Sequence, residues 1–122
     1  MDYKTWKING FSLELDLEDI ENMERYENAF EIMKEEEKSI PEDGKASKRI
    51  RAYCEMFWHL YDNIFGDGTS ERIFSGIKMH TGIYLDIYED FLKFVQMQKV
   101  RIAQDRAERI FKYLPKNDES VS

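Results

Sequence analysis

Cysteine and histidine are scarce in this sequence, and their scarcity limits the chemistry that the chain can support. The single cysteine, Cys54, cannot form an intramolecular disulfide. It falls on the apolar face of an expected helix, where we interpret it as a small buried hydrophobic residue. The two histidines, His59 and His80, show no metal-ligand spacing. The sequence therefore predicts no metal site.

Long hydrophobic runs are also lacking. No apolar run approaches the ~20 residues that a membrane-spanning helix requires. The start of the chain, MDYKTWKING, has no continuous apolar segment of the kind found in secretory signal peptides. We therefore expect a cytoplasmic protein with no membrane partner.

Catalytic signatures are missing as well. The metalloprotease helix motif, the P-loop, the nucleophile elbow and the glycine-rich dinucleotide turn do not occur. Gly66-Asp67-Gly68 lacks the following glycine or lysine of a phosphate-binding loop, so we interpret it as the turn at which one helix ends and the next begins. We expect a hydrogen-bonded structural role for His59 and a loop position for His80. The sequence thus predicts no catalytic residue and no cofactor. An enzyme would need a pocket that brings one of these histidines beside a carboxylate.

Basic residues are too few to give the chain a positive net charge. The formal net charge is −7 at pH 7, and residues 1–44 hold 14 acidic against 5 basic residues. Residues 45–122 hold 13 basic and 11 acidic residues. An acidic chain does not bind nucleic acid by neutralising phosphates, so we expect no nucleic-acid partner. An alternative function would depend on this excess of negative charge. An acidic DNA mimic that inhibits a host nuclease would carry a regular array of acids on the first helix.

The most apolar and aromatic stretch, residues 47–76, predicts the centre of the fold. Five of its residues recur at spacings of three and four and so share one face of a helix: Ile50, Cys54, Phe57, Tyr61 and Ile64. We expect this helix over residues 47–65, with Ser47 as its N-cap and Gly66 as a left-handed residue after its end. A short helix over residues 70–75 should follow the turn at Gly68.

The N-terminal residues 3–17 read as a β-hairpin. Asn9-Gly10 between two alternating runs predicts a tight turn, because both central residues of a type I′ turn need positive φ. That turn would pair Trp6 with Leu13 and Ile8 with Phe11 on one apolar face. A two-stranded hairpin is marginally stable alone, so we expect this face to dock on helices.

An acidic helix is expected over residues 18–37. Asp16 or Asp19 could cap it, and its outer face carries glutamates that we interpret as solvated surface. Three further glutamates, residues 35–37, stand where the helix dipole disfavours negative charge, so we expect fraying there. Residues 38–46 form the most loop-like segment.

The last helix is expected over residues 83–114, where Pro115 stops it. Unbroken, it would be about 48 Å long, so it either breaks near Gln98 or projects from the domain. Its second half carries apolar residues that are sparse but regular. They suit a seam for a partner protein or for a homo-oligomer, and the competing interpretation is a helix that packs back on its own domain. The candidate partner-binding residues are Ile102, Ile110, Phe111 and Tyr113.

Together these elements predict a predominantly helical α+β fold. We expect one domain, residues 1–115, in which the N-terminal hairpin packs on a bundle of three to four helices and a long C-terminal helix follows. Residues 116–122 are polar, and we expect them to be disordered.

Several segments, in their order, resemble a known family. They are INGFSLELDL (residues 8–17), ERYENAFEIM (residues 24–33), YDNIFGDGTSERIFSG (residues 61–76) and the long final helix. This arrangement is similar to the small tail-assembly-chaperone-like proteins encoded in the tail modules of phages and prophages of Gram-positive bacteria. The likeness covers residues 3 to about 98, and its sharpest part is IFGDGT (residues 64–69) followed by Ile73-Phe74.

The resemblance implies a non-catalytic role in virion morphogenesis in the host cytoplasm. Such proteins bind the long helical tape-measure protein and keep it soluble while tail-tube subunits polymerise around it. The implied partners are therefore the tape-measure protein, the tail-tube protein or both. A structural role as a head–tail connector component remains an alternative at this level.

Overall fold

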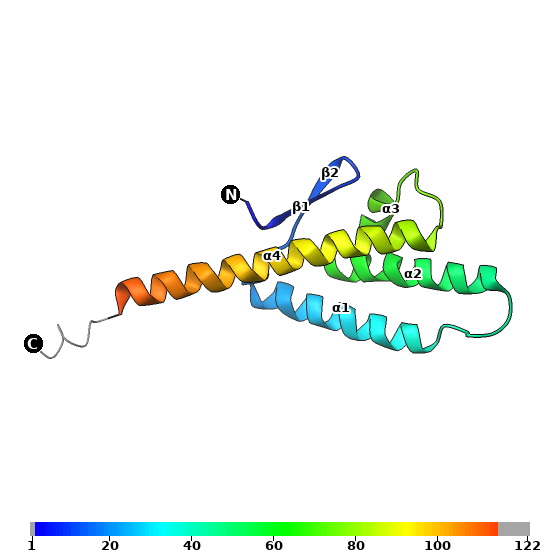
Figure 1. Ribbon diagram of the computed structural model, residues 1–122, viewed down its shortest axis with the longest axis horizontal. Coiled ribbons are helices and arrows are strands. Elements are labelled where there is room, and N and C mark those ends of the chain that lie inside the picture. Colours follow the sequence, from blue (N-terminus) through cyan, green and yellow to red (C-terminus); the bar gives the residue numbers. More distant parts are fainter. Residues whose placement is uncertain (1, 115–122) are drawn as a thin grey trace, which may run out of the picture.

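The computed structural model describes residues 2–114 and confirms a predominantly helical α+β fold. Its elements are β1 (Thr5–Ile8), β2 (Phe11–Glu14), α1 (Ile20–Lys38), α2 (Ala46–Phe65), α3 (Thr69–Ile73) and α4 (Thr81–Tyr113). In Figure 1, α1 and α2 form an antiparallel pair, α4 runs alongside them, and its C-terminal half extends past the bundle. The expected disordered tail, residues 116–122, lies outside the described residues.

The β-hairpin has the predicted turn and register. Asn9 and Gly10 adopt φ values of 47° and 79°, and Trp6 pairs with Leu13 while Ile8 pairs with Phe11. Trp6 and Leu13 are buried and the second pair is half-buried, so the apolar face covers the helices as expected. The Asn9 side chain also donates hydrogen bonds to carbonyl oxygens at the end of α3, including that of Ile73 at 3.0 Å. The turn therefore shapes the hairpin and also holds α3.

The indole of Trp6 lies at the centre of the aromatic core. Its ring centroid is 5.6 Å from that of Tyr61 on α2 and 5.0 Å from that of Phe91 on α4. Its Nε1 donates a 2.9 Å hydrogen bond to Asp90 Oδ2, so its polar edge is satisfied at the rim of the core. The hairpin is thus packed between α2 and α4 by one large side chain.

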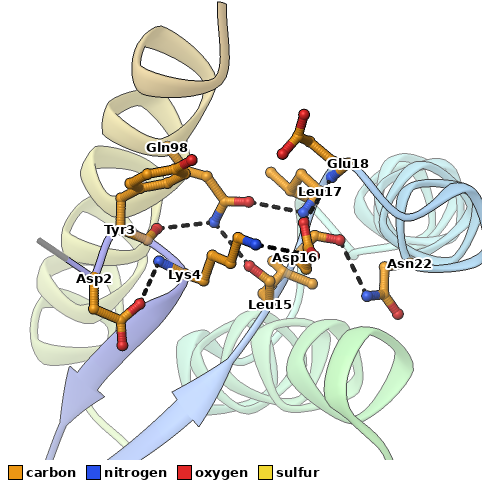
Figure 2. A network of polar contacts seen from close by, with 9 residues as sticks. All are labelled: Asp2, Tyr3, Lys4, Leu15, Asp16, Leu17, Glu18, Asn22 and Gln98. Atoms are coloured by element: carbon orange, nitrogen blue, oxygen red, sulfur yellow. Dashed lines mark hydrogen bonds and ion pairs between the residues drawn. The ribbon is translucent and has the colours of Figure 1, made fainter. Parts of the chain in front are cut away.

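Gln98 joins the middle of α4 to the N-terminal segment (Figure 2). Its side chain is fully buried. Its Oε1 accepts a 2.7 Å hydrogen bond from the backbone N–H of Leu17, and its Nε2 donates to the carbonyl oxygens of Leu15 at 2.8 Å and Tyr3 at 3.1 Å. The sequence analysis left open a break in the helix at this residue. The helix is instead continuous, and Gln98 satisfies three backbone groups that would otherwise be unpaired.

The acidic C-terminal end of α1 is ordered, which corrects the expected fraying. The helix is capped by Asp19, whose side chain accepts from the backbone N–H groups of Glu21 and Asn22, and it continues to Lys38. One cation in the last turn offsets part of the unfavourable charge near its end. Lys38 Nζ lies 3.2 Å from a carboxylate oxygen of Glu35.

Four details of α2 differ from the sequence prediction. Lys45 precedes the helix without a side-chain hydrogen bond, so Ser47 lies in the first turn and is not the N-cap. Gly66 has the predicted positive φ of 116°, but its ψ of 157° places it outside the left-handed helical region. Ile50 is 43% exposed, because this end of α2 extends past the start of α4. Met56 and Leu60 are buried in addition to the other four residues of the predicted stripe.

The start of α4 depends on a histidine that the sequence analysis placed in a loop without a partner. His80 precedes the helix, and its Nδ1 accepts a 3.2 Å hydrogen bond from the backbone N–H of Ile83. A Cβ at Gly82 would lie 3.0 Å from the His80 ring, so the glycine leaves room for this cap. Histidine is an uncommon N-cap residue, and the role therefore had no recognisable signature.

Replacing Gln98 should destabilise the protein strongly. In Gln98→Leu the partners of three backbone groups are lost, and we expect the free energy of unfolding to fall by about 3 kcal/mol. Gln96→Leu, an exposed position on the same helix, is the matched control and should change it by less than about 0.5 kcal/mol. Urea denaturation measures both values. Equal effects of the two variants would contradict the proposed anchoring role.

Removing the Tyr61 hydroxyl should not destabilise the protein. This hydroxyl is buried and has no hydrogen-bond partner among residues 2–114, and burial raises the pKa of Tyr61 far above its ordinary value. Tyr61→Phe should therefore leave the free energy of unfolding unchanged or raise it by about 1 kcal/mol. Because the folded-state pKa exceeds the unfolded one, stability should fall above pH ~10. The variant should lose less in that range, and a loss of stability at neutral pH would contradict this account.

Candidate functional site

The projecting end of α4 is the most exposed apolar surface that the structure describes. Ile102 is the last buried residue of the helix, at 8% exposure, and it lies beside Leu17 and Met23. Beyond it, Ile110 and Phe111 are 54% and 82% exposed. Apolar side chains of this size rarely gather on a solvated helix end without a function.

The four sequence-predicted partner-binding residues therefore separate into two groups. Ile110, Phe111 and Tyr113 lie exposed on the projecting end. The side chain of Ile102 belongs to the chain's own core, because the residues after β2 and the start of α1 still cover the helix at that point. The structure thus leaves three of the four available for a partner.

The exposed face contains a regular seam, as the sequence analysis expected, but it shares only Ile110 with the residues named there. Its residues are separated by three, four, three and four positions, which is the spacing of the a and d positions of a coiled coil. All of them are exposed, and Leu114 is the residue at which the helix ends. We call them the α4 seam: Val100, Ala103, Ala107, Ile110 and Leu114. On the helical wheel this face is turned away from the stripe that contains Phe91, Val95 and Ile102. The signal was present in the sequence, but it could be assigned only after the core-facing stripe was known.

Basic residues border the α4 seam. Lys99 and Arg106 occupy one edge, and residues 99–114 contain five basic and two acidic residues. One of the acids is already paired, since Asp105 Oδ2 lies 3.3 Å from Arg109 Nε. The seam therefore combines an apolar centre with one basic edge, while Gln104 and Glu108 follow its other edge, and this arrangement favours a partner helix or groove with an acidic border.

A second surface lies between α1 and α2. It is a groove of about 570 Å³ that is lined in part by apolar side chains, Ile32, Ile40 and Ala52. Four carboxylates also line it. We call it the α1–α2 groove, and its acidic residues are Glu31, Glu35, Glu36 and Glu55.

His59 lies at this groove and forms the contact that an enzyme hypothesis would require. Its Nδ1 is 2.6 Å from Glu36 Oε2, and the two side chains are 54% and 31% exposed. This pair links α2 to α1, as expected for a hydrogen-bonded structural histidine. Among the described residues no hydrogen bond joins His59 to a serine, threonine or cysteine, and Ser39 in the same groove donates to the Glu35 carbonyl. The pair lacks the activated nucleophile that covalent catalysis needs.

Other candidate chemistry is confined to buried or isolated groups. Cys54 is fully buried, as predicted, and burial raises the pKa of its thiol, which keeps it protonated at neutral pH. Within residues 2–114 no cluster of three histidine, cysteine, aspartate or glutamate side chains could hold a metal ion. None of the helices in this part of the chain combines the length and apolar character needed to cross a membrane.

The outer face of α1 carries a ridge of exposed carboxylates. The ridge residues recur at spacings of three and four and are Glu21, Glu24, Glu27, Glu31 and Glu35. They extend over about 21 Å of helix, or about one charge per 5 Å. A single strand of duplex DNA carries about one charge per 3.4 Å. The row of carboxylates is regular, but its charge per unit length is lower than that of the DNA that such a mimic would imitate.

Comparison with known proteins identifies a family without an assigned activity. A family model described as "Family of unknown function (DUF6673)" matches residues 9–120, so the chain belongs to this family. Neither the curated proteins nor the solved structures contain a match to the chain.

Serine substitutions should distinguish the exposed end of α4 from the core. The double variant Ile110→Ser/Phe111→Ser should change the free energy of unfolding by less than about 1 kcal/mol, because both side chains are exposed. Ile102→Ser should lower it by about 3 kcal/mol through loss of buried apolar contacts. Thermal and urea denaturation measure both. A large loss in the double variant would place Ile110 and Phe111 in a packed interface.

Proposed function

We propose that this protein is a non-catalytic binding factor of phage tail morphogenesis, which holds the tape-measure protein soluble through the projecting end of α4. The observation that carries this proposal is the exposed α4 seam, which continues beyond the protein's own core with coiled-coil spacing. The segments that resemble the tail-assembly-chaperone-like proteins fall on the hairpin, on α1, on the end of α2 with α3, and on α4 as far as about residue 98. They form the support from which this end projects.

The geometry of the α4 seam suits a helical partner. Val100 and Leu114 are separated by 14 residues, or about 21 Å of helix. A partner helix with a matching apolar stripe could pack along this length by knobs-into-holes contacts. A tape-measure protein is long and helical, and it would offer many such stripes to successive copies of this chain.

The small size of the surface favours reversible binding. Two of the five seam residues are alanines, so each copy buries little apolar area compared with the ~800 Å² per partner of a standard stable interface. Weak individual contacts would allow tail-tube subunits to displace the protein as they polymerise in the host cytoplasm. A tightly bound partner would instead obstruct assembly.

An acidic DNA mimic is the second candidate function, and the ridge on α1 favours it. Five exposed glutamates in a regular row could approach the basic cleft of a nuclease. The charge spacing of about 5 Å is wider than that of either DNA strand, so we rank this function below the first. Inhibition of a nuclease that falls steeply with added salt would support the second candidate.

Co-expression tests the proposed function directly. The partner to be tested is a tape-measure protein, which this proposal expects to be encoded near this gene, and the measured quantity is its soluble fraction with and without this chain. We expect the wild-type chain to raise that fraction several-fold, because it covers the apolar stripes through which the partner aggregates. The double variant Ile110→Ser/Phe111→Ser should raise it much less.

Ile20→Ser supplies the matched control for this experiment. Ile20 is 69% exposed but lies on α1, a different helix from the α4 seam, and it does not line the surface around Ile102. This variant should protect the partner as well as the wild-type chain does. Equal insolubility of the partner with and without the wild-type chain would contradict the proposal.

A further inference from the structure

We propose that the α1–α2 groove is a docking site for the projecting α4 end of a second copy of this chain. The inference goes beyond the proposed function, because it concerns self-association and does not depend on which protein the α4 seam binds in the cell. It rests on two surfaces of the same molecule that are complementary in charge and in apolar character and that cannot meet within one copy.

Charge complementarity is the first argument. Four carboxylates line the α1–α2 groove, and His59 is the only basic side chain among its lining residues. Glu36 is engaged by His59 and Glu35 by Lys38, whereas Glu31 and Glu55 make no ion pair within the described residues. On α4, Lys99 and Arg106 lie along the edge of the α4 seam next to Ile110, whereas Arg109 and Lys112 lie on the opposite face of the helix. Opposite charges of this kind orient an approaching surface and disfavour like-charged competitors.

Apolar complementarity is the second argument. Between its carboxylates the groove exposes Ile32 and presents Ile40 and Ala52 along a volume of about 570 Å³. The α4 seam presents Ile110 and Leu114, each more than half exposed. An amphipathic helix that lays such a stripe into an apolar groove is a recurrent mode of recognition.

The arrangement of the helices makes a second copy necessary. The groove is formed by the later part of α1 and the earlier part of α2, next to the loop that joins them. The free end of α4 points away from that loop (Figure 1). Because α4 is one continuous helix, its end cannot fold back to the groove of its own molecule. The α4 end and the groove are different surfaces, so two copies can exchange ends reciprocally or many can join in a chain.

Self-association of this kind would also cover the α4 seam when no other partner is present. Ile110 and Leu114 would then be shielded from water in the groove of a neighbouring copy. A helical partner that binds the α4 seam would compete with the groove and release single copies. Partner binding and self-association are therefore expected to be mutually exclusive.

Charge reversal followed by sedimentation velocity tests the proposal on the full chain. Glu31→Lys/Glu55→Lys replaces the two unpaired carboxylates of the groove with cations, and Lys99→Glu/Arg106→Glu makes the basic edge of the α4 seam acidic. Wild-type protein should associate as its concentration rises, and each double variant alone should associate at least about tenfold more weakly, because like charges would meet. An equimolar mixture of the two variants should associate again, since the acidic seam edge of one then matches the cations in the groove of the other.

Glu24→Lys/Glu27→Lys is the matched control. It makes the same change of net charge on exposed α1 residues that do not line the groove, and it should associate as the wild type does. A wild-type chain that remains monomeric at all concentrations would overturn the proposal. So would equal weakening by the groove and control variants, or weakening by the α4 variant alone, which indicates seam-to-seam pairing. The experiment contains only this protein, so its failure is distinct from failure to protect a tape-measure protein.

Discussion

The hydrogen bonds of one buried carboxamide determine where the N-terminal segment crosses the long helix. Gln98 accepts from the backbone of Leu17 and donates to the carbonyl oxygens of Leu15 and Tyr3 (Figure 2). A buried polar side chain is costly unless its hydrogen-bonding groups are paired, so this position admits little displacement of the segment along α4. About one turn later, Ile102 is the last residue of α4 whose side chain is buried. The anchor therefore sets the point at which the core ends and the free part of α4 begins.

The two halves of α4 consequently have different surroundings. Before Gln98, residues such as Phe91 pack against Trp6 and Tyr61 in an aromatic core, where each large ring contributes buried area and favourable ring geometry. After Ile102, the apolar residues shift to another face of the helix, and one edge of that face is basic. The α4 seam and the α1–α2 groove are therefore separate surfaces, the first with a basic edge and the second lined by carboxylates.

The sequence was most informative where local chemistry leaves few alternatives. Asn9-Gly10 predicted the hairpin and its register, because few residues tolerate positive φ in succession. Asp19 was among the two predicted caps of α1. The sequence was least informative about polar side chains with distant partners. Gln98 was considered only as a possible break in the helix, because nothing in the neighbouring residues indicates a hydrogen-bond partner more than 80 positions away. His80 was expected in a loop, because its neighbours do not indicate that it caps a helix.

By itself, the sequence determined the types of the elements, their order and the faces of the hairpin, since these follow from turn residues and from the periodicity of apolar side chains. The tertiary structure alone decided that α4 is unbroken, that Ile102 lies inside while Ile110 lies outside, and that His59 meets Glu36 across two helices. Periodicity shows that a helix has an apolar face but not how far along that face other segments reach. That limit depends on long-range contacts, and here the contacts of Gln98 with Leu15 and Leu17 set it.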